Sequence, residues 1–286
     1  MDKPRKIRKV SASRPTMEGA GVRLRRAFGF GETSLTDPFL LLDDFRGEHP
    51  RDFIKGFPWH PHRGIETITY MLEGTVEHGD SMGNSGTIGA GDAQWMTAGS
   101  GIIHQEMPKG DAKGRMGGFQ LWANLPARQK MMDPRYRDVK AADIPEVMLP
   151  GGATARLIAG RINDVSGPVR DIVADPEFLD ISLGPDTFFT HPVKPGYTAF
   201  AYVIGGEGTF DEKEGHHISN QDLVLFGDGS SIWVRSFGSG VRFLFLAGKP
   251  IREPVAWRGP IVMNTREELR LAFKQYADGT FIKKKA

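Results

Sequence analysis

The stretch that decides the fold is Gly56-Phe-Pro-Trp-His-Pro-His-Arg-Gly-Ile-Glu-Thr-Ile-Thr-Tyr-Met-Leu-Glu-Gly74, which joins two histidines to an alternating run. Alternate side chains of a strand share a face, so His60 and His62 point the same way. If the strand continues without a break, that face also carries Glu66 and Ile68. The stretch therefore predicts a strand that is polar at one end and apolar at the other.

A second run, Gly99-Ser-Gly-Ile-Ile-His-Gln-Glu106, repeats the pattern and places His104 and Glu106 on one face. A histidine pair alone is more often structural than metal-binding. Two such pairs on neighbouring strands, however, converge on one point, and imidazoles and carboxylates are metal ligands. The two runs together make His60, His62 and His104 candidate ligands of one mononuclear metal site, with Glu106 or Glu66 as the candidate carboxylate.

The composition favours an all-β protein. The 286 residues include 36 Gly and 19 Pro, which indicate many turns and few long helices. Short apolar or alternating runs recur between turn signals, as in antiparallel sandwiches and barrels. The predicted strands are 39–42, 67–72, 93–96, 119–123, 200–204, 223–226 and 243–246.

The cysteine count, the net charge and the length of the apolar runs exclude or disfavour several functional classes. The chain has no cysteine, so a metal must be held by His, Asp or Glu. A net charge of +2 gives no reason to expect direct nucleic-acid binding, and we interpret the basic residues Lys3 to Lys9 as a solvated tail. No apolar run has the length of a membrane span and no signal segment is visible, so a soluble, cytoplasmic protein is expected.

The chain is long enough for two domains. A polar segment, 133–152, separates two strand-rich halves, so we predict domains at 1–140 and 141–286. The second includes a C-terminal helix, which Thr265 and Glu268 begin as a capping box and which Gly279 ends. The apolar stripe of this helix is expected to pack on one of the barrels.

The two halves resemble diverged copies. Tyr70-Met-Leu-Glu-Gly74 matches Tyr202-Val-Ile-Gly-Gly206, and Gly91-Asp92 falls opposite Gln221-Asp222. Extending these matches places the ligand positions of the second half at residues that do not bind metals, namely Pro192, Lys194, Val234 and Ser236. We therefore expect one metal per chain, in the first barrel only.

The ordered pattern of His60, His62, Glu66, Gly74, Gly91-Asp92 and His104 resembles the two-part cupin motif. More closely, the chain resembles the pirin family in segments that span nearly its whole length. These segments are 37–45, 56–74, 94–106, 120–126 and 259–268. The resemblance implies two tandem cupin barrels of the double-stranded β-helix, or jelly-roll, type, with an iron-type metal in the N-terminal one.

The resemblance also bears on the fourth ligand, for which two carboxylates compete. Most cupins use the glutamate of the first motif, here Glu66, whereas pirins use the one after the third histidine, here Glu106. We follow the pirin pattern and interpret Glu66 as a carboxylate that orients a ligand histidine. Trp59, Phe57 and Trp95 lie close to the motifs and could line a flat apolar pocket, although barrel core is the alternative.

The family includes proteins described as quercetin 2,3-dioxygenases and as transcriptional co-regulators. The leading hypothesis is a dioxygenase that uses Fe(II), a flavonol and dioxygen, with Glu106 as ligand and base. The ligand set also suits Mn, Ni, Cu or Zn. The alternatives are a redox-sensitive module that regulates transcription through protein contacts, and a purely structural metal.

Overall fold

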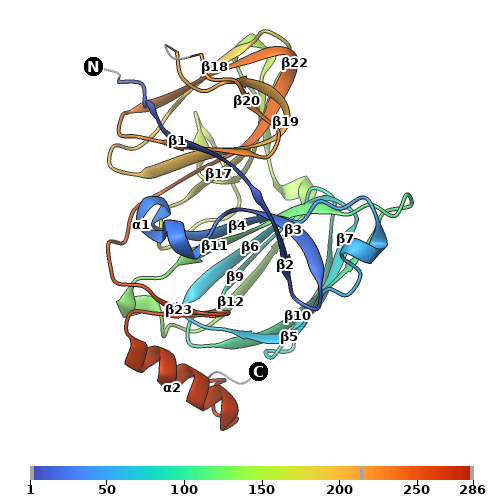
Figure 1. The fold of residues 1–286 in the computed structure, drawn as a ribbon, viewed down its shortest axis with the longest axis vertical. Helices are drawn as coiled ribbons and strands as arrows, with labels where there is room; N and C mark the ends of the chain where they lie inside the picture. The colour runs from blue at the N-terminus through green and yellow to red at the C-terminus, as the bar shows by residue number, and fades with distance from the viewer. Residues whose placement is uncertain (1–2, 213–214, 284–286) are drawn as a thin grey trace. The chain divides into compact units, whose positions relative to one another are not determined.

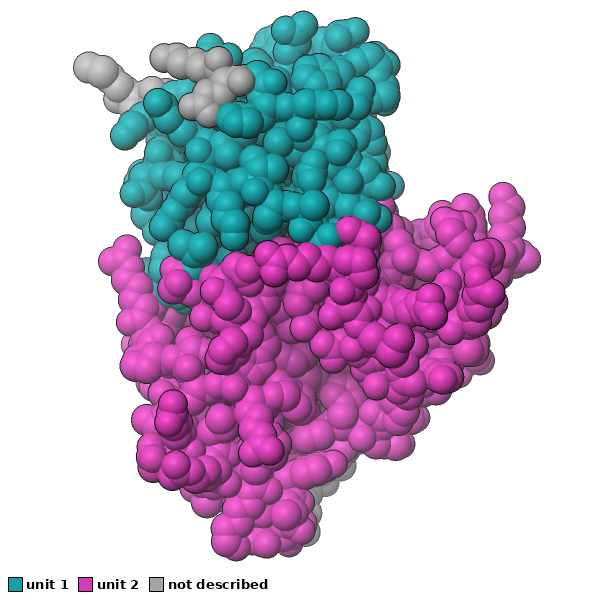
Figure 2. Space-filling view, in the orientation of Figure 1, with its two compact units in different colours: residues 1–13, 35–37, 142–250 teal, residues 14–34, 38–141, 251–286 magenta. Residues whose placement is uncertain are grey.

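The computed structural model describes residues 3–212 and 215–283, most of which lie in β-strands. The described chain folds into two compact units (Figure 2). Unit 1 comprises residues 1–13, 35–37 and 142–250, and unit 2 comprises residues 14–34, 38–141 and 251–286. Each unit has antiparallel sheets of its own, and a helix follows near the C-terminus (Figure 1). The predicted all-β class, its seven strands and its C-terminal helix are confirmed.

Unit 2 contains a seven-stranded sheet in the order β12-β9-β6-β11-β4-β3-β2 and a four-stranded sheet in the order β5-β10-β7-β8. Its strands are β2 (Arg14–Glu18), β3 (Val22–Phe28), β4 (Phe39–Asp44), β5 (Phe57–His62), β6 (Ile65–Glu73), β7 (Thr75–Asp80), β8 (Ser85–Gly89), β9 (Ala93–Thr97), β10 (Ile102–Lys109), β11 (Gly117–Asn124), β12 (Arg135–Val139), β23 (Ala256–Arg258) and β24 (Ile261–Met263). Helix α2 (Arg266–Ala277) completes this unit.

Unit 1 is built on one large sheet in the order β1-β21-β19-β22-β17-β14-β13, to which β18 and β20 add through β22 and β19. Its strands are β1 (Ile7–Ala12), β13 (Glu146–Met148), β14 (Thr154–Ala159), β15 (Arg161–Ile162), β16 (Val165–Ser166), β17 (Glu177–Leu183), β18 (Phe188–Pro192), β19 (Thr198–Thr209), β20 (Ile218–Ser219), β21 (Asp222–Phe226) and β22 (Ser231–Gly248). The single-turn helix α1 (Thr33–Thr36) has its first two residues in unit 2 and its last two in unit 1.

The compact units differ from the predicted domains at both ends of the chain. Strand β1 pairs with β21, so an N-terminal segment completes unit 1. Helix α2 packs Ala272 against Ile261 and Met263, so the C-terminal segment belongs to unit 2 rather than to the second half. The helix itself begins as predicted, because the Thr265 hydroxyl accepts from the Glu268 backbone N–H in a capping box. The boundary near residue 140 stays a prediction.

The two units repeat one strand pattern. Tyr70 of β6 pairs with Ala93 of β9, and Tyr202 of β19 pairs with Leu223 of β21. The turn before the second strand is also shared: the Gly91 N–H donates to the Met71 carbonyl, and the Gln221 N–H donates to the Val203 carbonyl. Asp92 and Asp222 each accept a backbone N–H from three residues earlier. These equivalences support a duplicated barrel.

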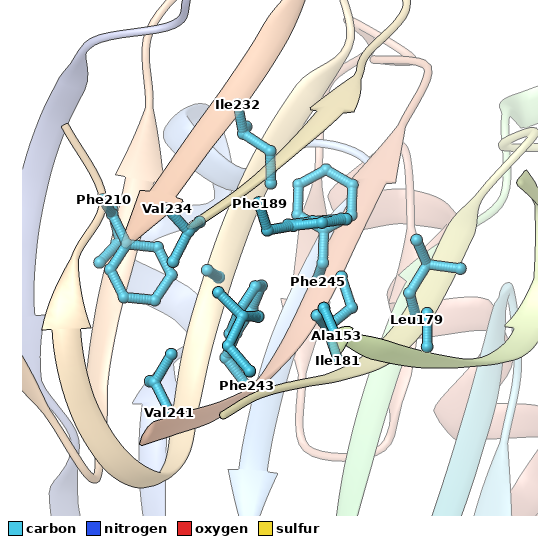
Figure 3. Close-up of a cluster of buried hydrophobic side chains, with 14 of the residues drawn as sticks. Ala153, Leu179, Ile181, Phe189, Phe210, Ile232, Val234, Val241, Phe243 and Phe245 are labelled. Atoms are coloured by element: carbon cyan, nitrogen blue, oxygen red, sulfur yellow. The ribbon is translucent and has the colours of Figure 1, made fainter. Parts of the chain in front are cut away.

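The interior of unit 1 is filled by apolar side chains. Phe189, Val234 and Phe245 point into one buried cluster with Phe210 and Phe243 (Figure 3). All five are at most 5% exposed. Burial of these aromatic rings stabilises the barrel. The buried His191 ring packs against Phe189 and Phe245. In the described part of the chain, no helix is long and apolar enough to cross a membrane.

Candidate metal centre

Two antiparallel strands of unit 2 bring the three predicted histidines together. Strand β5 pairs with β10 so that His60 lies opposite His104 and His62 lies opposite Ile102. Paired and alternate residues of two such strands share a face, so all three imidazoles project to the same side. Their nearest ring nitrogens all lie within 4.8 Å of one another.

The hydrogen bonds of the rings show that this cluster suits a cation. The Nδ1 atoms of His60 and His62 lie 2.9 Å and 3.0 Å from the carbonyls of Pro58 and Pro260, so each carries a proton and donates it. In a neutral ring the Nε2 atom then holds a lone pair. His60 Nε2 lies 3.0 Å from Nε2 of His62 and 3.0 Å from Nε2 of His104. Lone pairs that face each other repel, and a metal ion between them converts the repulsion into ligation.

The protonation state of the rings favours the same function. Burial lowers the pKa of His60, and it holds the pKa of His62 and of His104 well below 6.5. The three rings are therefore neutral at pH 7, the form that binds metals. The proximity of the rings to one another adds to this effect, because one charged imidazole disfavours charge on the next.

Glu106 lies on the same strand as His104, beyond a bulge in the β5–β10 pairing. Its carboxylate is buried and lines the same cavity as His60 and His62, and its Oε1 lies 3.2 Å from the Thr69 hydroxyl. Burial raises the pKa of Glu106 to about 7, and the Thr69 hydroxyl partly offsets that rise. Glu106 is outside the group of three converging rings but faces the same space.

Glu66 does not face this space, so the predicted common face is wrong. The strand ends at His62, turns at Gly64 with a φ of +77°, and restarts at Ile65. A Cβ on Gly64 would lie 2.0 Å from the Val262 carbonyl oxygen, which leaves room for glycine alone. This corner shifts the alternation by one residue.

The alternation beyond the corner gives the orientation of Glu66. Thr69 lines the cavity, and Glu66 lies three positions earlier in a regular stretch, so it points to the opposite face of β6. There its Oε1 accepts a 2.7 Å hydrogen bond from Thr97, and burial raises its pKa. Glu66 contacts none of the three histidines through a hydrogen bond among those the structure shows.

The C-terminal segment supports the histidine strand from behind. Besides the Pro260 carbonyl that fixes the His62 ring, the backbone of Val262 donates to the Arg63 carbonyl at 3.1 Å. The buried Arg63 guanidinium donates to the carbonyls of Ser100 and Phe281, both at 2.7 Å, and lies 4.1 Å from the Phe281 ring centre. Contacts of this kind orient ligand rings and tune metal affinity.

A buried lysine secures the Gly64 corner. The Lys130 ammonium donates to the Gly64 carbonyl at 2.8 Å, to Asn124 Oδ1 at 2.6 Å and to the Val262 carbonyl at 3.1 Å. Burial lowers its pKa to about 7, yet three acceptors match the three protons of the charged form. Lys130 thus joins the corner after the histidines to the C-terminal strand β24.

A cavity of about 750 Å³ opens beside the site. His60, His62 and Glu106 line it together with mostly apolar and aromatic side chains and a few polar ones. The lining includes Phe45, Phe57, Leu24, Leu41, Val76, Met116, Trp122, Trp257, Thr69, Gln120, Arg26 and Asp43. Such a volume and lining are typical of sites for small organic ligands.

The predicted pocket residues divide into one that lines the cavity and two that do not. Phe57 lines it, opposite Glu106 on the neighbouring strand. Trp59 is 53% exposed, and Trp95 is buried on β9 opposite Ile68, on the same face as Glu66. Nearness in sequence suggested these tryptophans, but strand alternation directs both away from the histidines.

Sequence reasoning missed the tryptophans that do line the cavity. The Trp122 ring packs edge-on against His62 with centroids 5.0 Å apart, and Trp257 lies 5.8 Å beyond it. Trp122 could have been found from its alternation with Gln120, which also lines the cavity. Trp257 lies far along the chain, and only the fold brings β23 to the site.

Unit 1 has apolar side chains at two of the four positions where unit 2 has candidate ligands. Because Val234 corresponds to His104, the β18–β22 register places Phe189 and His191 at the positions of His60 and His62. The predicted equivalents Pro192 and Lys194 are therefore wrong, since the loops differ in length. His191 instead pairs with Glu177 at 2.9 Å. Within residues 3–212 and 215–283, only the His60 group brings together three or more His, Cys, Asp or Glu ligand atoms.

Both halves of the chain match models of known protein families. The Pirin family matches residues 21–123, and the Pirin C-terminal cupin domain matches residues 178–282. A pirin-like protein of Caulobacter vibrioides is 43% identical over 97% of this chain and 99% of its own. A Pseudomonas aeruginosa protein named "putative quercetin 2,3-dioxygenase" is 40% identical over 98% of this chain and 99% of its own.

Solved structures show the same fold. A quercetin 2,3-dioxygenase from Acinetobacter baumannii has a TM-score of 0.87 and 30% identity, over 98% of this chain and 99% of that one. The bacterial pirin YhhW from Escherichia coli, in complex with nickel(II), has a TM-score of 0.65 and 25% identity, over 85% of this chain and 99% of that one.

Proposed function

The chain belongs to the pirin family, and from that premise we propose that it is a metal-dependent flavonol 2,3-dioxygenase. The observation that carries the proposal is the convergence of three neutral imidazole nitrogens beside an aromatic cavity of about 750 Å³. A flat polyphenol fits a space of this size and lining. Relatives named as quercetin 2,3-dioxygenases support the choice of substrate class.

The metal would be held by His60, His62, His104 and Glu106, one ion per chain. Three imidazoles and a carboxylate suit iron, and they also suit Mn, Ni, Cu or Zn. The nickel(II) complex of the Escherichia coli pirin is in keeping with that breadth. When bound, a redox-capable metal supplies the activation of dioxygen that the reaction requires.

Glu106 would act as the base that accepts the flavonol hydroxyl proton. A flavonol must lose its hydroxyl proton before its ring becomes electron-rich enough to be oxidised, and the Glu106 carboxylate faces the cavity where that hydroxyl would lie. Burial raises the pKa of Glu106 to about 7 in the metal-free site. In the metal-loaded protein the carboxylate would accept the hydroxyl proton as the flavonol binds. The Thr69 hydroxyl lies 3.2 Å from Glu106 Oε1 and 2.6 Å from Gln120 Oε1, so it sits between the carboxylate and the amide oxygen.

The remaining lining would position the substrate. Phe57 and Trp122 offer apolar ring surfaces in the cavity lining, and Trp122 packs edge-on against His62. Gln120 places a side-chain amide in the same space, hydrogen-bonded to Thr69 at 2.6 Å. An amide next to the carboxylate offers a contact to a second hydroxyl or carbonyl of a polyphenol.

The test combines metal analysis with dioxygen uptake. Protein loaded anaerobically with Fe(II) should bind one metal and consume dioxygen when quercetin is added. His62→Gln should lose both properties, because it removes a converging imidazole. His191→Gln is the matched control, since it changes the equivalent position of unit 1 and should leave both intact.

Quercetin-independent uptake, or equal uptake in His62→Gln, would rule the dioxygenase out. The redox-sensitive protein-binding module predicted as the alternative makes a different prediction. In that case a partner protein should bind only one oxidation state of the metal-loaded protein, with no consumption of quercetin.

A further inference from the structure

A second hollow, of about 440 Å³, adjoins the ligand cavity in unit 2. Its lining residues come from strand β23 and helix α2. These two elements lie next to each other (Figure 1). Its lining consists of Trp257, Arg258, Arg266, Leu269, Arg270 and Phe273. Trp257 and Arg258 also line the larger cavity, so Arg258 borders both spaces.

The charge of this hollow is entirely positive. Three of the six lining side chains are arginines and none is acidic. Within residues 3–212 and 215–283, Arg258 and Arg266 form no ion pair, and Arg270 meets Glu267 only at 3.4 Å on an exposed helix face. Arg258 is held by its contact with the Phe273 ring, 5.1 Å from its centre. Arg258 is thus fixed in place while its charge remains available.

The larger cavity does not neutralise these arginines. Two of its acidic side chains, Asp43 and Glu18, are engaged by Arg26 at distances of 2.7 Å and 2.9 Å. The third, Glu106, is buried beside the histidines. The unpaired positive charge therefore lies in the arginine hollow. The acidic group not paired with Arg26 is Glu106, at the metal site.

A path of aromatic rings connects the two ends. Trp122 packs on His62 with centroids 5.0 Å apart, and Trp257 follows at 5.8 Å from Trp122. A planar aromatic ligand that stacks along these rings would extend from the histidines toward Arg258. Guanidinium groups bind sulfate, phosphate and carboxylate through paired hydrogen bonds, more strongly than they bind neutral groups.

We propose that the arginine hollow binds an anionic substituent of an aromatic ligand whose ring occupies the cavity. The substrate class is thereby narrowed to phenolic compounds that carry a sulfate, phosphate or carboxylate at the end remote from the metal. This inference rests on the proposed function for the identity of the ring, and on the arginines for the identity of the substituent.

The test compares quercetin with quercetin 3′-sulfate and quercetin 7-sulfate, which carry the anion at opposite ends of the flavonol. Binding to the metal-loaded protein is measured by calorimetry without dioxygen. At least one sulfate should bind about tenfold more tightly than quercetin, and the preference should shrink as salt is raised. The ratio should approach one in the double variant Arg258→Gln/Arg266→Gln.

Arg23→Gln is the matched control, because Arg23 is an exposed arginine of the same unit outside both hollows and should keep the tenfold ratio. If quercetin binds but neither sulfate binds more tightly, or the ratio survives the double substitution, the anion site is wrong and the dioxygenase stands. If quercetin does not bind while a sulfate binds through the arginines, the anion site stands and the flavonol dioxygenase proposal fails. Arginine-dependent binding of a polyglutamate peptide, but of neither sulfate, would identify an acidic protein segment as the occupant and overturn the proposal.

Discussion

Glu66 and Glu106 are both buried carboxylates, yet strand alternation gives them different surroundings. Glu106 faces the cavity with the histidines, and Glu66 faces away toward Thr97. The sequence could predict the three histidines, because two pairs with the same spacing carry them. It could not predict which way Glu66 points, because that depends on a corner that Gly64 forms against the Val262 carbonyl.

Replacing each glutamate with glutamine should separate the two roles. Glu106→Gln removes a charged group facing the metal and should weaken metal binding by more than about 100-fold, beyond the usual effect of a supporting residue. Glu66→Gln should change it less than about tenfold. Competition with a chromogenic chelator measures both affinities. Equal losses, or a larger loss in Glu66→Gln, would contradict Glu106 as the fourth ligand and favour Glu66 of the first motif.

Glu66 should also make stability depend on pH. Burial raises its pKa above the ordinary 4.5, so between these two values the folded state holds more protons than the unfolded state. The contribution of Glu66 to the free energy of unfolding therefore falls as pH rises above 4.5. Glu66→Gln should be more stable than wild type at pH 7, with the difference vanishing below pH 4. Urea unfolding at several pH values checks this, and a difference that is constant with pH would contradict it.

At the scale of elements, the metal centre depends on a segment from the far end of the chain. Strands β5 and β10 supply the ligands, but the Pro260 carbonyl sets the His62 ring and Phe281 covers Arg63. The capping box of α2 could be predicted because its signal is local. The place where the helix packs could not, since the apolar stripe fits either barrel until the pairing of Arg63 with Ile261 is known.

Phe281→Ala should therefore weaken the metal site without altering a ligand. The substitution removes the ring that packs on the Arg63 guanidinium, next to His62, and should lower metal affinity about tenfold. The ligand-field bands of the Co(II)-substituted protein should shift, which a general loss of stability would not cause.

Leu271→Ala, at a 53% exposed position of α2, is the control and should keep the wild-type affinity and spectrum. An unchanged spectrum in Phe281→Ala would show that the C-terminal segment does not orient His62.

At the scale of the whole molecule, one barrel pattern occurs twice with different contents. The turns at Gly91 and Gln221 make equivalent hydrogen bonds, which the sequence match anticipated. The sequence match placed the equivalents of His60 and His62 three residues too far along the chain. A match by spacing alone cannot allow for loops of unequal length. The strand register shows instead that Phe189 and Val234 fill the space that His60 and His104 occupy in unit 2.

One tightly bound metal per chain follows from this difference. His191 alone remains at a ligand position of unit 1, and Glu177 already engages it. Elemental analysis of protein purified without added metal and then loaded anaerobically should plateau at one equivalent. A plateau of two equivalents that both survive dialysis would contradict the assignment.

The central claim, that the histidine cluster and its cavity form a flavonol dioxygenase, is tested most directly with isotopically labelled dioxygen. Iron-loaded protein is mixed with quercetin under ¹⁸O₂, and the product is examined by mass spectrometry. A dioxygenase must place both labelled atoms in the ring-opened product, and His104→Ala must form none of it. Incorporation of one labelled atom or none by the wild-type protein would contradict the claim.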